Sequence, residues 1–71
     1  MTLVEYRKLK NLKQKDIAKS LGVNRSTISK WESGTYYPSL QKIVRLSEIL
    51  CVSRSEIIEA LVKTKVEFEG G

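Results

Sequence analysis

The chain has 71 residues, of which thirteen are Lys or Arg and eight are Asp or Glu, so its formal net charge is +5. A single domain of this size buries only about 60% of the surface that its unfolded chain exposes, and we therefore expect a partner subunit to add stability. With no histidine and one cysteine, the chain lacks the usual zinc sites and the Ser-His and Cys-His pairs of nucleophilic enzymes.

These absences predict a protein that is not an enzyme and that binds no metal, no cofactor and no small-molecule ligand. The acids are scattered, and no glycine-rich phosphate loop precedes a predicted helix. No apolar run approaches the roughly 18 residues that span a bilayer, and no targeting segment is visible, so we expect no membrane association. Cys51 has no internal disulfide partner and lies between apolar Leu50 and Val52. We expect a reduced, packed thiol in a cytoplasmic protein.

The charge is distributed unevenly along the chain. Residues 1–45 hold ten bases and three acids, whereas residues 46–71 hold three bases and five acids. A basic front half and a mildly acidic back half predict a face that binds a polyanion and a separate end for other contacts. Charge alone supports nucleic acid no better than it supports ordinary solvated helix faces.

The first predicted helix runs from about residue 3 to residue 10. Thr2 and Glu5 have the spacing of a capping box at its start, and Asn11, which tolerates left-handed backbone, is expected to end it. Apolar residues that recur on one face predict a second helix over 14–21. Its inward side chains are expected to be Ile17, Ala18 and Leu21.

A third helix is predicted between Asn24 as N-cap and Gly34 as the C-terminal glycine. Its inward side chains are expected to be Ile28 and Trp31. Gly22 lies between the second and third helices, where the turn favours a positive φ. Two helices joined by a short turn that contains glycine predict a helix-turn-helix unit over 14–33.

After a loop that ends at Pro38, Ser39 is expected to cap a fourth helix. The inward side chains of that helix are expected to be Leu40, Ile43, Leu46 and Leu50. Ser53 and Glu56 form a second capping box, which opens a short fifth helix with Ile57, Ile58 and Leu61. The sequence therefore predicts an all-α class, with five helices in a domain over residues 1–61 and a tail over 62–71.

The tail alternates apolar and polar residues with the period of two that is typical of a strand. If the tail paired antiparallel with its own copy about Val66, lysines of one copy would lie opposite glutamates of the other. A short C-terminal β-strand could therefore form a homodimer. The predicted interface residues are Val62, Thr64, Val66 and Phe68. The alternative is a frayed tail, with any dimer formed through Ile57, Ile58 and Leu61 of the fifth helix.

Taken in register, this pattern resembles the repressor and Cro type of helix-turn-helix regulators, the XRE-type family. The resemblance covers about residues 3–61. It rests on Leu12 followed by Gln14, Ile17-Ala18, Leu21-Gly22-Val23, Ile28-Ser29-Lys30-Trp31-Glu32, Gly34, Pro38 and Leu50 to Ser53. The chain departs from the family pattern at Lys13, where Ser or Thr is usual, at Asn11, where glycine is common, and at Cys51, where glycine or asparagine is frequent.

The resemblance implies a transcriptional regulator, a repressor, that binds double-stranded DNA with its third helix in the major groove, and a dimer would imply a palindromic operator. The implied base contacts are Asn24, Arg25, Ser26 and Lys30, and Ser29 is expected on the same polar face. The implied phosphate contact is Gln14, and further candidates from their positions are Lys13, Lys15, Ser33, Thr35 and Tyr36. For Tyr36 and Tyr37, packing against the core is an equal alternative.

The resemblance implies that Arg7 and Glu32 form a structural ion pair between the first helix and the end of the third, against the alternative of two independent surface charges. A second functional hypothesis is an antitoxin-like interaction module that binds a partner protein through its tail. The only feature that favours this hypothesis is the short, partly acidic tail after Val62.

Overall fold

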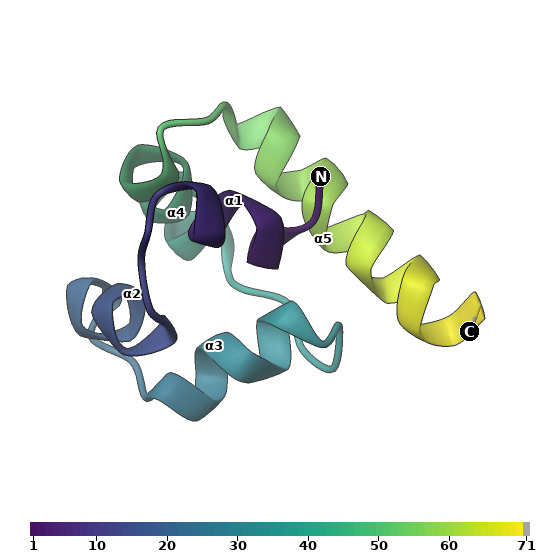
Figure 1. Cartoon of the computed structure of the whole chain (residues 1–71), viewed down its shortest axis with the longest axis horizontal. Helices are drawn as coiled ribbons and strands as arrows, with labels where there is room; N and C mark the ends of the chain where they lie inside the picture. The colour runs from purple at the N-terminus through teal and green to yellow at the C-terminus, as the bar shows by residue number, and fades with distance from the viewer. Residues whose placement is uncertain (71) are drawn as a thin grey trace.

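The computed structural model describes the backbone of residues 1–70 and the side chains of residues 1–64. It contains α1 (Leu3–Leu9), α2 (Gln14–Leu21), α3 (Arg25–Glu32), α4 (Leu40–Leu50) and α5 (Arg54–Gly70). The predicted all-α class with five helices is confirmed, and no strand occurs among the described residues. In Figure 1, α2 and α3 meet at a corner, α1 lies beside α5, and the end of α5 extends beyond the other helices. None of the helices described has the length and hydropathy needed to cross a membrane.

One hydrophobic core collects side chains from all five helices. Its largest fully buried members are Leu3, Ile17, Ile28, Leu46, Leu50 and Ile57. Trp31 and Ala18 are also buried, as expected for the inward faces of α3 and α2. Because side chains three or four positions apart share a helix face, each short helix gives one stripe to this core.

The expectation of an inward side chain is wrong for Leu40 and Ile58. Leu40 is 77% exposed, because it is the first residue of α4 and precedes the stripe that enters the core. Ile58 is 46% exposed, because it lies about 100° around the helix from the buried Ile57. Ile57 and Leu61 are both buried within their own chain, so neither is available to the dimer interface proposed for the fifth helix.

The predicted capping boxes at the starts of α1 and α5 are present. The Glu5 carboxylate accepts the Thr2 amide at 2.7 Å, and the Glu56 carboxylate accepts the Ser53 amide at 3.2 Å. These backbone hydrogen bonds hold the pKa of each carboxyl below its usual value. The Tyr6 hydroxyl also donates to Glu56 at 3.3 Å, which ties α1 to α5. Burial, followed by the Glu56 charge, raises the pKa of Tyr6.

The first four helices end in the same way, at a residue with left-handed backbone. These residues are Asn11 (φ 56°), Gly22 (φ 70°), Gly34 (φ 78°) and Cys51 (φ 57°). In each case the next amide donates to the carbonyl five positions back, over 3.2 Å (Leu12 to Arg7), 3.0 Å (Val23 to Ala18), 2.9 Å (Thr35 to Lys30) and 3.1 Å (Val52 to Ser47). This 6→1 bond is the mark of a Schellman motif, which satisfies the last carbonyls of a helix.

Two of these four positions carry a side chain in a conformation that disfavours one. The expectation of a packed Cys51 is wrong, because the left-handed turn leaves the thiol exposed while the neighbouring Val52 packs against the core. Asn11 occupies the left-handed conformation that was expected of it.

The predicted C-terminal strand is also wrong, because α5 continues as a helix through residues 62–70. A strand needs an edge to pair with, whereas a helix already begun gains one hydrogen bond for each residue it adds. Of the expected strand-interface residues, Val62 is 54% exposed, and Thr64 is buried with its hydroxyl donating to the Ala60 carbonyl at 2.8 Å. The side chains of Val66 and Phe68 lie outside the described residues.

We predict that Cys51→Gly stabilises the protein. Glycine removes the steric cost of left-handed backbone, about 1 kcal/mol, and the exposed thiol contributes little packing. Urea denaturation of the two proteins measures the difference. Cys51→Ala is the control, because it keeps a Cβ and should give no gain.

Gly22 also has left-handed backbone, and nothing lies within 4 Å of a Cβ added there. Gly22→Ala should therefore cost about 1 kcal/mol through the backbone conformation alone. A stabilising Gly22→Ala would contradict this account.

Candidate nucleic-acid interface

A salt bridge joins α1 to the last residue of α3. Arg7 Nε donates to Glu32 Oε2 at 2.6 Å, and Nη2 donates to Oε1 at 3.3 Å. The third guanidinium nitrogen, Nη1, donates to the Leu12 carbonyl at 3.0 Å. The side chains are only 13% and 6% exposed. The two residues that the resemblance places together therefore form a nearly buried, two-point contact that joins α1 to the end of α3.

Gln14 belongs to the same network. Its Nε2 donates to Glu32 Oε1 at 2.7 Å, so Glu32 holds the first residue of α2 as well as α1. A side-chain amide has two N–H groups, and this bond uses one of them. The other N–H is not used by this bond, and the helix dipole and the first backbone amides at the start of α2 favour an anion there.

The opposite end of α2 is held by two bases of α4. Lys42 Nζ donates to the Leu21 carbonyl at 2.9 Å, and Arg45 Nη2 donates to the Ser20 carbonyl at 3.3 Å. Cations at a helix C-terminus satisfy carbonyls that have no partner within the helix. Sequence reasoning missed this role, because more than twenty positions separate the partners and no local pattern signals the contact.

The outer face of α3 is polar and exposed. Asn24, Arg25, Ser26, Ser29 and Lys30 are all exposed, whereas Ile28 and Trp31 on the opposite face are buried. Asn24 has the backbone of an N-cap but makes no side-chain capping bond, so its amide is not used by the helix. The structure thus places all five residues expected to contact bases on one accessible surface.

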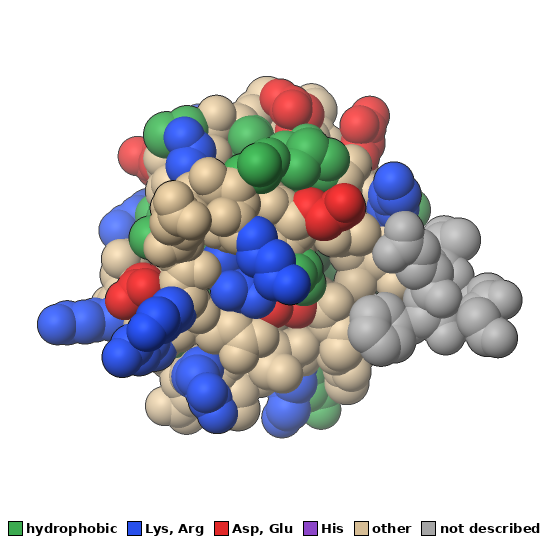
Figure 2. Space-filling model, viewed as in Figure 1, with side chains coloured by type: hydrophobic (Ala, Val, Ile, Leu, Met, Phe, Trp, Pro, Cys, Tyr) green, Lys and Arg blue, Asp and Glu red, His purple; other side chains and the backbone are tan. Residues whose placement is uncertain are grey.

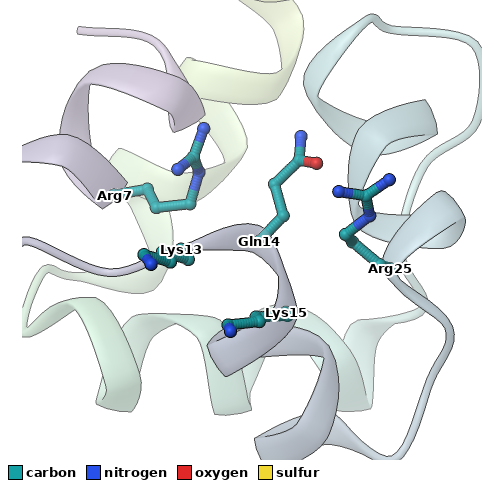
Figure 3. Close-up of a pocket in the computed structure, with 5 residues that line it drawn as sticks. All are labelled: Arg7, Lys13, Gln14, Lys15 and Arg25. Atoms are coloured by element: carbon teal, nitrogen blue, oxygen red, sulfur yellow. The ribbon is translucent and has the colours of Figure 1, made fainter.

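A basic pocket adjoins the start of this surface. It is open, has a volume of about 420 Å³, and is lined by Arg7, Lys13, Gln14, Lys15 and Arg25. Figure 3 shows these side chains around one opening, contributed by α1, the start of α2 and the start of α3. Three of the expected phosphate contacts therefore meet here, together with Arg25 from the expected base contacts.

The remaining expected phosphate contacts lie at the other end of α3. Ser33 Oγ and Thr35 Oγ1 are 2.8 Å apart, and Ser33 also donates to the Lys30 carbonyl at 3.1 Å. Tyr36 and Tyr37 are 58% and 49% exposed, so neither packs into the core. The Lys30 ammonium lies 5.1 Å from the centroid of the Tyr36 ring. The sequence did not predict this contact.

Cationic side chains gather on this part of the molecule. In Figure 2, Lys and Arg predominate over the region of α2 and α3, and Asp and Glu are more frequent toward the opposite edge of the view. The described residues contain no group of three or more His, Cys, Asp or Glu side chains that could hold a metal ion. The concentration of positive charge is suited to contact with an extended anion.

Comparison with known proteins gives a consistent set of relatives. The Helix-turn-helix family matches residues 3–57. The chain is 44% identical over 52 residues to an uncharacterised HTH-type transcriptional regulator of Methanocaldococcus jannaschii, covering 73% of this chain and 79% of that protein. It is 39% identical over 56 residues to the HTH-type transcriptional activator BcrR of Enterococcus faecalis, covering 79% of this chain but only 28% of BcrR. No solved structure matches.

A phage protein is a third relative. The ImmF control region 10 kDa protein of Bacillus phage phi105 is 34% identical over 67 residues, which covers 94% of this chain and 72% of the phage protein. The family match over residues 3–57 spans the corner of α2 and α3 and the pocket beside it.

We predict that breaking the Arg7–Glu32 contact destabilises the fold. Arg7→Met or Glu32→Gln should each lower the free energy of unfolding by about 3 kcal/mol, since each leaves a nearly buried polar group without its partner. The double variant should lose less than the sum of the two single losses. Urea denaturation measures all three. Lys19→Met, a change at an exposed base, is the control and should stay within about 0.5 kcal/mol of the wild type. Additive losses would show that the two charges act independently.

Proposed function

Because this chain belongs to the repressor/Cro-type (XRE-type) helix-turn-helix family of DNA-binding transcriptional regulators, we propose that it represses transcription by occupying a specific operator with α3 in the major groove. The observation that carries this proposal is the exposed polar face of α3 beside the basic pocket. A helix fits the major groove, and a cationic pocket at one end of it matches the phosphate backbone at the groove edge.

The side chains on α3 have the chemistry for reading bases. Arg25 and Lys30 can donate to O6 and N7 of guanine, and Asn24 can pair with N6 and N7 of adenine. Ser26 and Ser29 can donate to or accept from base edges. Arg25 lies where the pocket meets this face, so its side chain can reach a base at the edge of the site.

Phosphates are proposed to bind at the start of α2 and just after α3. At the start of α2, Lys13, Gln14 and Lys15 line the pocket, and Glu32 holds the Gln14 amide in place. After α3, the proposed contacts are the hydroxyls of Ser33, Thr35 and Tyr36. These contacts fix the register of α3 on the duplex without reading sequence.

We further propose that the protein binds as a homodimer to a palindromic operator. The support is the small size of the domain and an exposed apolar pair on α5, Ile58 and Val62, which lie one helical turn apart. Two copies related by a two-fold axis would present two recognition helices about 34 Å apart, which is one turn of DNA.

Selection of bound sequences from random DNA, followed by titration of variants, tests base reading. Lys30→Ala and Arg25→Ala should each cost about 1–3 kcal/mol on the selected site and should relax the base preference at one position. Lys15→Ala should weaken binding to selected and random DNA alike. It should also make the slope of log K against log salt shallower, by the contribution of about one neutralised phosphate. Lys19→Ala is the control. Equal losses on both DNAs for Lys30→Ala would refute its role in base recognition.

Sedimentation analysis tests the dimer. Replacement of Ile58 and Val62 by lysine places charge in the proposed interface and should yield monomers, while both side chains are exposed enough for the fold to survive. Circular dichroism checks that the helices remain. Glu59→Lys, on the same helix but outside the apolar pair, should leave the association unchanged. An unchanged dimer in the double variant would exclude this face of α5.

A further inference from the structure

Lys30 and Tyr36 are in contact, although one lies on α3 and the other in the loop that follows it. The distance from Nζ to the ring centroid is 5.1 Å. An ammonium group within about 6 Å of an aromatic face is attracted by the negative charge density of that face. Tyr36 is 58% exposed, so its ring is not committed to the core.

The loop that carries Tyr36 is tied to Lys30 itself. The Lys30 carbonyl accepts the Thr35 amide at 2.9 Å and the Tyr36 amide at 3.3 Å. It also accepts the Ser33 hydroxyl at 3.1 Å. Gly34 makes this return possible, because its φ of 78° turns the chain back over the last turn of α3. The backbone of Lys30 therefore sets the position of the ring that its own side chain contacts.

A lysine side chain without such a contact samples many rotamers. It must lose this freedom when it binds a base edge, and that loss weakens the contact. A side chain already held near one position loses less. The Tyr36 ring provides such a hold, at a point where the end of α3 meets the exposed loop.

We propose that Tyr36 is a positioning residue for base recognition, whose ring holds the Lys30 ammonium and so sets the discrimination at the base pair that Lys30 contacts. The inference rests on the proposed function, since it takes Lys30 to read a base. It concerns the ring, whereas the phosphate contact expected from Tyr36 concerns the hydroxyl.

Three variants separate the ring from the hydroxyl. Tyr36→Phe removes the hydroxyl and keeps the aromatic face, Tyr36→Leu removes both, and Tyr37→Leu is a control that removes the neighbouring ring. The first measurement is the ratio of affinities for the selected site and for the same site changed at the Lys30-dependent base pair. The second needs no DNA: it is the ring-current shift of the Lys30 ε-methylene protons in the NMR spectrum of the free protein.

The expected results distinguish the variants. Tyr36→Leu should lower the discrimination ratio by about two- to fivefold, the factor that corresponds to an exposed cation–π contact, and should abolish the ring-current shift. Tyr36→Phe and Tyr37→Leu should preserve both. In a Lys30→Ala background, Tyr36→Leu should have no further effect on the ratio, because the side chain it positions is gone.

Other outcomes overturn the inference or the function separately. An equal loss of affinity on all sequences for Tyr36→Leu, with the discrimination ratio unchanged, overturns the positioning role and leaves the proposed function intact. A loss of discrimination that persists in the Lys30→Ala background also overturns the positioning role. A wild-type protein without any base preference overturns the proposed function itself.

Discussion

The contact between Arg7 and Glu32 is the constraint on which the rest of the site depends. Both groups are nearly buried, so each charge needs the other to offset its loss of hydration. The two oxygens of Glu32 accept two guanidinium nitrogens and the amide of Gln14, which come from α1 and α2. Glu32 itself ends α3. One carboxylate therefore fixes three helices, and the pocket that these helices line takes its shape from this contact.

Short helices make such a constraint necessary. The first four contain seven to eleven residues, and isolated helices below about 12–15 residues are marginal in water. Their stability comes from capping at both ends and from the shared core. The Schellman turns at Asn11, Gly22, Gly34 and Cys51 also redirect the chain sharply, so that five helices pack within 71 residues. Left-handed backbone is unfavourable for the side chains of Asn11 and Cys51, and the packing of the surrounding structure offsets this cost.

The cations of the basic front half divide into two groups with different physical roles. Arg7, Lys42 and Arg45 bind carbonyls or a carboxylate within the protein and hold the ends of α2 and α3 in place. Lys13, Lys15 and others lie on the exposed surface around the pocket, where a polyanion can reach them. A count of charges in the sequence combines both groups. The first group holds α2 and α3 rigidly, and the second group is therefore presented to a polyanion in a fixed arrangement.

Local physics determined what the sequence could predict by itself. Capping boxes, left-handed residues and apolar periodicity act over a few positions, and they gave the five helices, the buried Ile28 and Trp31, and the outward face of α3. Long-range contacts were decided by the tertiary structure, because the bonds of Lys42 and Arg45 to α2 join residues that no pattern relates. The exposed Cys51 and the helical end of α5 have local causes, namely the left-handed turn after α4 and the continuation of a helix already begun. A period of two describes a strand only where an edge exists to pair with it, and the folded chain continued the helix instead.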